Sequence, residues 1–227
     1  MAGDIPSQIE YEHHLSHTFP GFFSAITLFM LIDVWSPFSL TDQVIADFNT
    51  LIAFIGFVLL VGTVLGVVLD NIHHSILEGM VFDQFDEVQL WIKKFNILMN
   101  KNPDTLSHEC SENIAYYYFV KKLGPESIGY ITHLRKSKYC YSEFYSNTFL
   151  SLVPFSMVSP FYLAKTFNIY WNLCIYMLIF LLFLSIISLI SSYQAYLNYN
   201  RSLYHLVSGF VDADEKGTQL NVKISFE

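Results

Sequence analysis

Residues 51 to 69 read LIAFIGFVLLVGTVLGVVL, a run of nineteen residues without a charged side chain. A helix needs about 20 apolar residues to cross the hydrocarbon core of a bilayer, because each residue adds about 1.5 Å. A second uncharged run, NIYWNLCIYMLIFLLFLSIISLISSY, occupies residues 168 to 193. These two stretches predict an integral membrane protein built from helices.

The composition of the whole chain agrees with this class. Of its 227 residues 53% are apolar and 14% charged, and the mean hydropathy is +0.39, whereas a soluble domain carries about 25% charged residues. The net charge of −8 disfavours sequence-independent nucleic-acid binding. Three scattered cysteines without a CxxC pair indicate neither a disulfide framework nor a zinc finger.

Two further stretches complete a prediction of four transmembrane helices. The first runs from about Phe19 to Leu40 and contains one acid, Asp33. The other runs from about Thr148 to Ala164 and is interrupted by Pro154 and Pro160, so it is either a kinked span or a re-entrant segment. The predicted fold class is therefore an all-α integral membrane protein with four spans.

The basic residues orient these spans. Eight of the twelve lie between the second and third spans: Lys93, Lys94, Lys101, Lys121, Lys122, Arg135, Lys136 and Lys138. Three more follow the fourth span, and Lys165 alone lies on the other side. Because cytoplasmic loops carry the excess of Lys and Arg, both termini are predicted to be cytoplasmic, in a multi-pass protein of the plasma (inner) membrane.

The predicted organisation has five parts: an N-terminal arm (1–18), transmembrane helices 1 and 2 (19–70), a cytoplasmic helical insert (71–147), transmembrane helices 3 and 4 (148–193) and a C-terminal tail (194–227). In the insert, apolar residues recur every three or four positions from Phe82 to Met99, which predicts an amphipathic helix. A second helix is expected from Asp104 or Ser107, and a third from about Glu126. The alternation from Gln219 to Phe226 allows one short strand.

A stripe of small and ionisable residues follows the inner half of the second span. Gly62, Gly66, Asp70 and His73 fall on one helical face at about 100° per residue. One interpretation is ordinary packing at the glycines, with Asp70 and His73 at the hydrated end of the helix. The other is a gate at the cytoplasmic mouth of a pore, formed by Asp70, His73 and His74, with imidazoles that make opening sensitive to pH.

Asp33 lies near the outer end of the first span. It is interpreted either as an interfacial residue or as part of an acidic outer vestibule with Asp42 and Asp47, which would favour cations over anions.

The densest positive cluster is formed by Arg135, Lys136 and Lys138. Attraction to anionic lipid headgroups explains it simply. The alternative is an anion or effector site that also uses Arg201 and binds a nucleotide or oligonucleotide, with aromatic residues 116–118 stacking on bases.

The histidines suggest a competing class. The motif HHLSH at residues 13–17, together with His73 and His74, resembles the histidine boxes of membrane di-iron desaturases and hydroxylases, but the chain has no HxxHH motif. Imidazoles of His13, His14 and His17 are weak metal candidates. Because no GxSxG, P-loop, HExxH or paired-carboxylate motif occurs, neither an enzyme nor a cofactor is predicted.

The layout and size of the chain resemble small four-span membrane effector subunits of bacterial anti-phage defence systems. This resemblance implies a membrane oligomer with a cytoplasmic sensing insert that opens a pore. The predicted function is therefore an oligomeric, cation-conducting channel of four or more copies, gated by its cytoplasmic helices. The alternative is a non-conducting anchor or sensor in the lipid bilayer that recruits a soluble partner protein through the insert.

Overall fold

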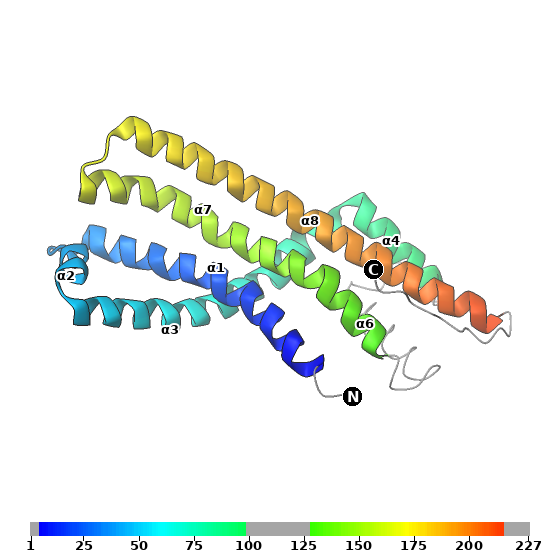
Figure 1. Ribbon diagram of the computed structural model, residues 1–227. Coiled ribbons are helices and arrows are strands. Elements are labelled where there is room, and N and C mark those ends of the chain that lie inside the picture. The colour runs from blue at the N-terminus through cyan, green and yellow to red at the C-terminus, as the bar shows by residue number, and fades with distance from the viewer. Residues whose placement is uncertain (1–4, 99–127, 216–227) are drawn as a thin grey trace. The chain divides into compact units, whose positions relative to one another are not determined.

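The computed structural model describes the backbone of residues 5–98 and 128–215. These ranges are almost wholly helical and contain no strand (Figure 1), so the predicted all-α class is confirmed. The expected second helix of the insert and the expected strand at 219–226 lie outside the described residues.

The described elements follow one another along the chain as α1 (Ile5–Trp35), α2 (Leu40–Ala46), α3 (Phe48–Ile72), the π-helix η1 (His73–Val81), the 3₁₀ turn η2 (Phe82–Gln84), α4 (Asp86–Leu98), α6 (Ile128–Leu134), the π-helix η4 (Arg135–Tyr139), α7 (Cys140–Phe167) and α8 (Trp171–Glu215). They form two compact units. The first unit comprises Met1–Glu78 and Cys140–Ala195, and the second comprises Gly79–Tyr139 and Tyr196–Glu227. The second unit thus combines residues of the predicted insert with residues of the predicted tail.

Three helical stretches of the described residues are long and apolar enough to cross a membrane: Ser16–Trp35, Phe48–Gln84 and Trp171–Gly209. This supports a multi-pass membrane protein. The predicted third span is part of α7, which packs along α1 (Figure 1) but is more polar and contains Pro154 and Pro160.

The first span differs from its predicted bounds at both ends. The helix already begins at Ile5, so much of the predicted N-terminal arm belongs to α1. It ends at Trp35 rather than Leu40, because Pro37 disfavours helical geometry at the residue before it. After this break Ser39 caps the short helix α2 by accepting a hydrogen bond from the backbone nitrogen of Asp42.

The N-terminus of α3 is fixed by Asp47. Its carboxylate accepts hydrogen bonds from the side-chain hydroxyl of Thr50 at 2.8 Å and from the backbone nitrogen of Thr50 at 3.0 Å. These bonds satisfy one of the unpaired N–H groups of the first helical turn. The same bonds, first that of the hydroxyl, hold the pKa of Asp47 below its ordinary value.

A serine seam joins α7 to α8 within the first unit. The Ser192 hydroxyl donates to the backbone carbonyl of Ser142 at 2.9 Å and contacts the hydroxyl of Ser146, while the Ser142 hydroxyl donates to the carbonyl of Ser192 at 3.1 Å. All three side chains are buried. Small hydroxyl residues let helix backbones approach closely and bond across the contact, which explains why α7 can be polar in composition.

One face of α4 lies in the core of the second unit. Val88, Ile92 and Phe95 on this face are buried, which confirms the predicted amphipathic helix. The helix begins at Asp86 rather than Phe82, because a 3₁₀ turn precedes it. The Tyr196 hydroxyl, at the start of the second unit's part of α8, donates to the carboxylate of Asp83 at 2.7 Å.

Candidate functional site

The candidate site of the first unit depends on a close crossing of α1 and α3. A Cβ atom at Gly21 would overlap the carbonyl of Gly62 and lie 2.7 Å from the backbone nitrogen of Gly66. A Cβ at Gly66 would overlap the carbonyl of His17. Gly21 and the predicted packing residue Gly66 therefore lie where only glycine lets the two backbones touch. A Cβ at Gly62, the other predicted packing residue, would instead overlap the ring of Phe22. One turn further along α3, this crossing places Asp70 beside His17.

The carboxylate of Asp70 lies close to side chains from three elements, α1, η1 and α7. Its Oδ1 lies 3.3 Å from Nδ1 of His17 on α1, and its Oδ2 lies 3.6 Å from Nε2 of His74 on η1. The side-chain amide of Asn147 on α7 donates to Oδ1 at 3.5 Å. Asp70 is thus held by side chains that are far apart in sequence.

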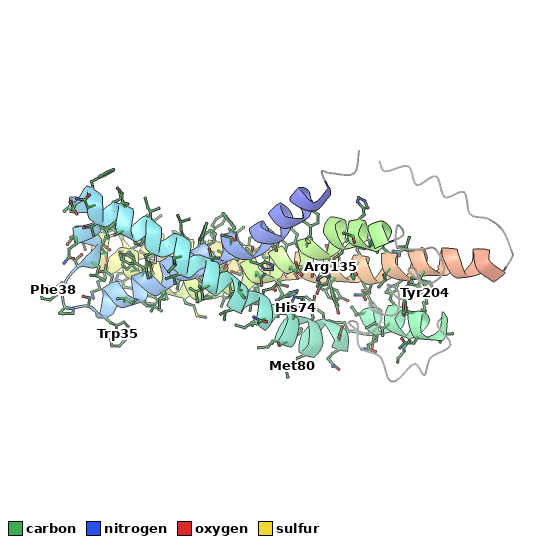
Figure 2. The ribbon with its side chains drawn as sticks, turned by 90° about the horizontal axis from the view of Figure 1, so that it is seen from below. Trp35, Phe38, His74, Met80, Arg135 and Tyr204 are labelled. Carbon is green, nitrogen blue, oxygen red and sulfur yellow. The ribbon has the colours of Figure 1, made fainter. Side chains whose placement is uncertain are left out.

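The π-helix η1 brings two imidazoles to one carboxylate. Nε2 of His73 lies 3.0 Å from Oε1 of Glu78, and Nδ1 of His74 lies 3.0 Å from Oε2 of the same residue. His73 is completely buried, whereas the side chain of His74 is 38% exposed. Figure 2 marks the position of His74. A π-helix has a wider turn than an α-helix and often occurs at functional sites.

Helix α7 supplies the remaining polar groups. Glu143 is 1% exposed, and its Oε1 lies 3.8 Å from Nε2 of His74. One turn later the Asn147 amide donates to the backbone carbonyl of Ser16 at 3.3 Å and lies 3.4 Å from Nδ1 of His17. Asn147 therefore ties α7 to both α1 and Asp70.

We call this set the His/carboxylate cluster; its titratable members are His17, Asp70, His73, His74, Glu78 and Glu143. Each carboxylate has an imidazole nitrogen within 4 Å. Two subsets have ligand atoms that all lie within 4.8 Å of one another: His73, His74 and Glu78, and Asp70, His74 and Glu143. Imidazole and carboxylate groups at such spacing can bind a metal ion or exchange protons.

The cluster contains the predicted mouth residues Asp70, His73 and His74. His73 lies wholly inside the helix packing of the chain, whereas the side chains of Asp70 and His74 are partly exposed. Of the weak metal candidates, His17 belongs to the cluster, while the side chains of His13 and His14 lie outside the described residues.

Asp33 lies at the other end of α1 and has a local role. Its carboxylate accepts hydrogen bonds from the backbone nitrogen of Leu40 at 2.5 Å and from the hydroxyl of Thr41 at 2.6 Å. The Thr41 hydroxyl also contacts that of Tyr162 on α7. Asp33 therefore fixes the turn between α1 and α2 and ties it to α7.

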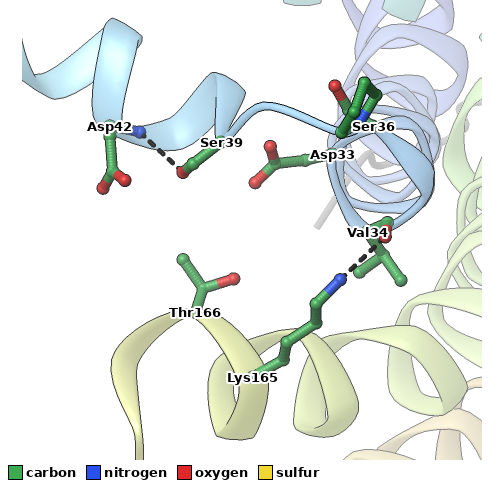
Figure 3. Close-up of a pocket in the computed structure, with 8 residues that line it drawn as sticks. Asp33, Val34, Ser36, Ser39, Asp42, Lys165 and Thr166 are labelled. Atoms are coloured by element: carbon green, nitrogen blue, oxygen red, sulfur yellow. Dashed lines mark hydrogen bonds between the residues drawn. The ribbon is translucent and has the colours of Figure 1, made fainter.

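A polar pocket of about 330 Å³ opens beside this turn (Figure 3). Asp33, Asp42 and Lys165 contribute its charged groups, and Nζ of Lys165 donates to the backbone carbonyl of Val34 at 2.8 Å. Of the predicted vestibule acids, Asp33 and Asp42 line this pocket, and Asp47 instead caps α3.

The basic candidates contact different partners in the second unit. The Arg135 guanidinium lies 5.3 Å from the ring centre of Tyr139, and that of Arg201 lies 5.7 Å from the ring centre of Trp91. Nζ of Lys138 donates to the hydroxyl of Ser202 at 2.6 Å. The side chain of Lys136 and residues 116–118 lie outside the described residues. Each of the three described cations thus contacts a different partner.

Sequence reasoning missed Glu78, Glu143 and Asn147. Glu78 carried a signal, because it lies one turn beyond His74 on a helical face, at a spacing suited to a shared contact. Glu143 and Asn147 are also one turn apart, but only the packing of α7 against α1 and η1 shows what they face.

No protein-family model, curated protein or solved structure matches the chain.

Proposed function

We propose that the chain is a four-span membrane protein that assembles into an oligomeric cation channel, with the His/carboxylate cluster at the cytoplasmic end of the ion path. The observation that carries this proposal is the cluster itself. Ionisable side chains are costly inside apolar helices, and where they occur they commonly mark ion paths and proton relays.

We assign α7 as the remaining transmembrane helix, the third of four in chain order, because it reaches from one polar end of the first unit to the other. Asn147 contacts the cluster, and Tyr162 contacts the turn held by Asp33. The two residues are fifteen positions apart, which corresponds to about 22 Å of helix. The serines along this length, Ser151, Ser156 and Ser159, are buried and need not face lipid.

The orientation proposed follows the basic residues. The second unit and the sequence around it hold eleven of the twelve lysines and arginines, which supports a cytoplasmic location for both termini in the inner membrane. The cluster then faces the cytoplasm, and the pocket beside Asp33 faces outward.

Carboxylates at both ends support cations as the permeant species. Asp70, Glu78 and Glu143 lie in the cluster, and Asp33 and Asp42 line the outer pocket. Acidic groups raise the local cation concentration.

Exposed apolar faces support assembly of several copies. In the most apolar windows of α3 and α8 only 11% of the residues are buried within the chain. These faces need lipid or neighbouring copies, because an apolar surface of that extent is unstable in water. Four helices enclose little space, so a lumen calls for four or more chains.

The test is ion flux into liposomes that contain the purified full chain. We expect potassium flux above that of empty liposomes, and a reduced or altered flux for Asp70→Asn and His74→Gln. Asp86→Asn is the matched control, because Asp86 is an exposed acid in the first turn of α4. Wild-type flux equal to that of empty liposomes would refute the channel.

A second candidate, a non-conducting anchor or sensor, is favoured by the separate second unit. The insert and the segment after Ala195 form one compact unit, which is suited to contact a soluble partner or an anionic ligand such as a nucleotide. In the anti-phage interpretation this unit would receive the signal of infection. Stable copurification of one protein together with absent flux would favour the anchor.

A further inference from the structure

We propose that His73, His74 and Glu78 form a binding site for one divalent transition-metal ion of the zinc(II) or iron(II) class. The site goes beyond the proposed channel and does not depend on it. Its three ligand atoms would be Nε2 of His73, Nδ1 of His74 and a carboxylate oxygen of Glu78. Each of the three residues offers one ligand atom within 4.8 Å of those of the other two.

The distances in η1 suit a shared ion. Each imidazole nitrogen lies 3.0 Å from its facing oxygen of Glu78. Ligand atoms about 2.0–2.2 Å from a tetrahedral ion are separated by roughly 3.3–3.6 Å. Each nitrogen–oxygen pair would therefore need to open by only a few tenths of an ångström to reach the spacing of ligands around one ion.

The second observation is that the side chain of His73 is completely buried without a hydrogen bond to either ring nitrogen among the described residues. Nε2 is close to the Glu78 carboxylate but is not aligned for a hydrogen bond to it. A buried polar group without such a bond is costly, and coordination to a metal would satisfy Nε2.

Surrounding groups supply the outer support that metal sites need. If Nδ1 of His74 binds the ion, its Nε2–H points to the carboxylates of Asp70 at 3.6 Å and Glu143 at 3.8 Å. A carboxylate behind a ligating imidazole fixes its tautomer and raises its basicity. Asp70 is in turn oriented by Asn147 and His17.

The ligand set defines the class of metal. Two imidazoles with one carboxylate favour zinc, iron, copper or nickel, whereas magnesium and calcium prefer oxygen ligands. His74 is partly exposed, so an ion and a further ligand such as water can reach the site from that side. Three protein ligands with an open position are the pattern of a reactive rather than a purely structural metal site.

The experiment is a zinc titration of the full chain, purified in detergent, stripped with a chelator and followed by calorimetry. We expect about one zinc ion per chain and no response to magnesium. His73→Gln and Glu78→Gln should remove the tight site, and Asp70→Asn should weaken it by roughly 10 to 100-fold. His133→Gln, which changes an exposed histidine of the second unit, should bind as the wild type does.

Cobalt(II) binding to the wild-type chain provides a test that does not depend on whether a variant folds. The wild-type chain loaded with cobalt should give visible absorption typical of a four-coordinate site, and X-ray absorption should detect two imidazole ligands. Absence of zinc binding in the wild type would overturn the proposal, as would unchanged binding in both ligand variants. Loss of binding in Glu143→Gln with retention in Glu78→Gln would also overturn it and place the ion between Asp70, His74 and Glu143. None of these results depends on ion flux.

Discussion

Two acids of the first unit, Asp33 near the C-terminal end of α1 and Asp70 near the C-terminal end of α3, differ in what they contact. Asp33 is bonded to the backbone of Leu40 and the hydroxyl of Thr41, seven and eight residues along the chain. Asp70 instead contacts His17, His74 and Asn147, which come from three elements. An acid with nearby hydrogen-bond donors stabilises a turn, whereas an acid among imidazoles is available for chemistry.

The largest expected effect concerns the crossing that creates the cluster. Gly66→Leu would place side-chain atoms into the backbone of α1 at His17, so we expect a loss of about 1–3 kcal/mol in stability or no folded protein. Because the substitution would push α1 away from α3, it would also move His17 away from Asp70. Thermal unfolding in detergent and zinc binding measure both consequences.

Gly56→Leu is the matched control, because nothing lies within 4 Å of a Cβ at Gly56 on the same helix. It should leave stability and zinc binding near wild type. Equal damage from the two substitutions would show that the close crossing is not what holds the cluster together.

The next effect distinguishes Asp33 from Asp70 by stability and zinc affinity. Asp33→Ala removes the acceptor of two hydrogen bonds, so we expect a loss of about 1–3 kcal/mol in the free energy of unfolding. Zinc affinity should stay unchanged, because the cluster is some 24 Å away along α1. Unfolding in denaturant and calorimetry would measure the two quantities.

Asp70→Ala should give the opposite pattern, with weaker zinc binding as its main result. If Asp33→Ala reduced zinc affinity as much as Asp70→Ala does, the distinction between a turn-forming acid and a cluster acid would be wrong.

A smaller effect is expected at the serine seam. Ser192→Ala removes a hydroxyl that bonds Ser142 and contacts Ser146. Hydrogen bonds between membrane helices contribute about 0.6 kcal/mol on average, so thermal unfolding should shift slightly and zinc binding should not. Ser208→Ala, an alteration in the second unit, serves as control.

The smallest effect is expected at Asp47, the cap of α3. Its pKa is lowered by the hydrogen bonds from Thr50, so its contribution to stability is present above the unfolded pKa of about 3.9. That contribution is lost as the pH falls through the lower, folded pKa.

Asp47→Ala should therefore speed hydrogen exchange in the first turn of α3 at pH 7, and the difference from wild type should shrink in strong acid. Asp47→Asn should behave more like the wild type, because asparagine also caps helices well. A difference that grew as the pH fell would contradict the sign of this linkage.

The sequence by itself determined the class of the protein and the main helices. Membrane helices are identified by local composition over about 20 residues. This composition can be read without knowing which other segments the helix packs against. The amphipathic face of Val88, Ile92 and Phe95 was predictable for the same reason, because helical periodicity is local. Local patterns failed at the helix ends, where Pro37 and the π-helix η1 changed the geometry.

Only the tertiary structure decided which ionisable residues meet. The stripe of Gly62, Gly66 and Asp70 was visible in the sequence, but its partner His17 is more than fifty positions away. Glu143 comes from α7, where Pro154 and Pro160 left the sequence open to either a kinked span or a re-entrant segment. Burial against other helices gives those residues their role, and the physical reason is that packing between distant segments leaves no periodic signal in either segment alone.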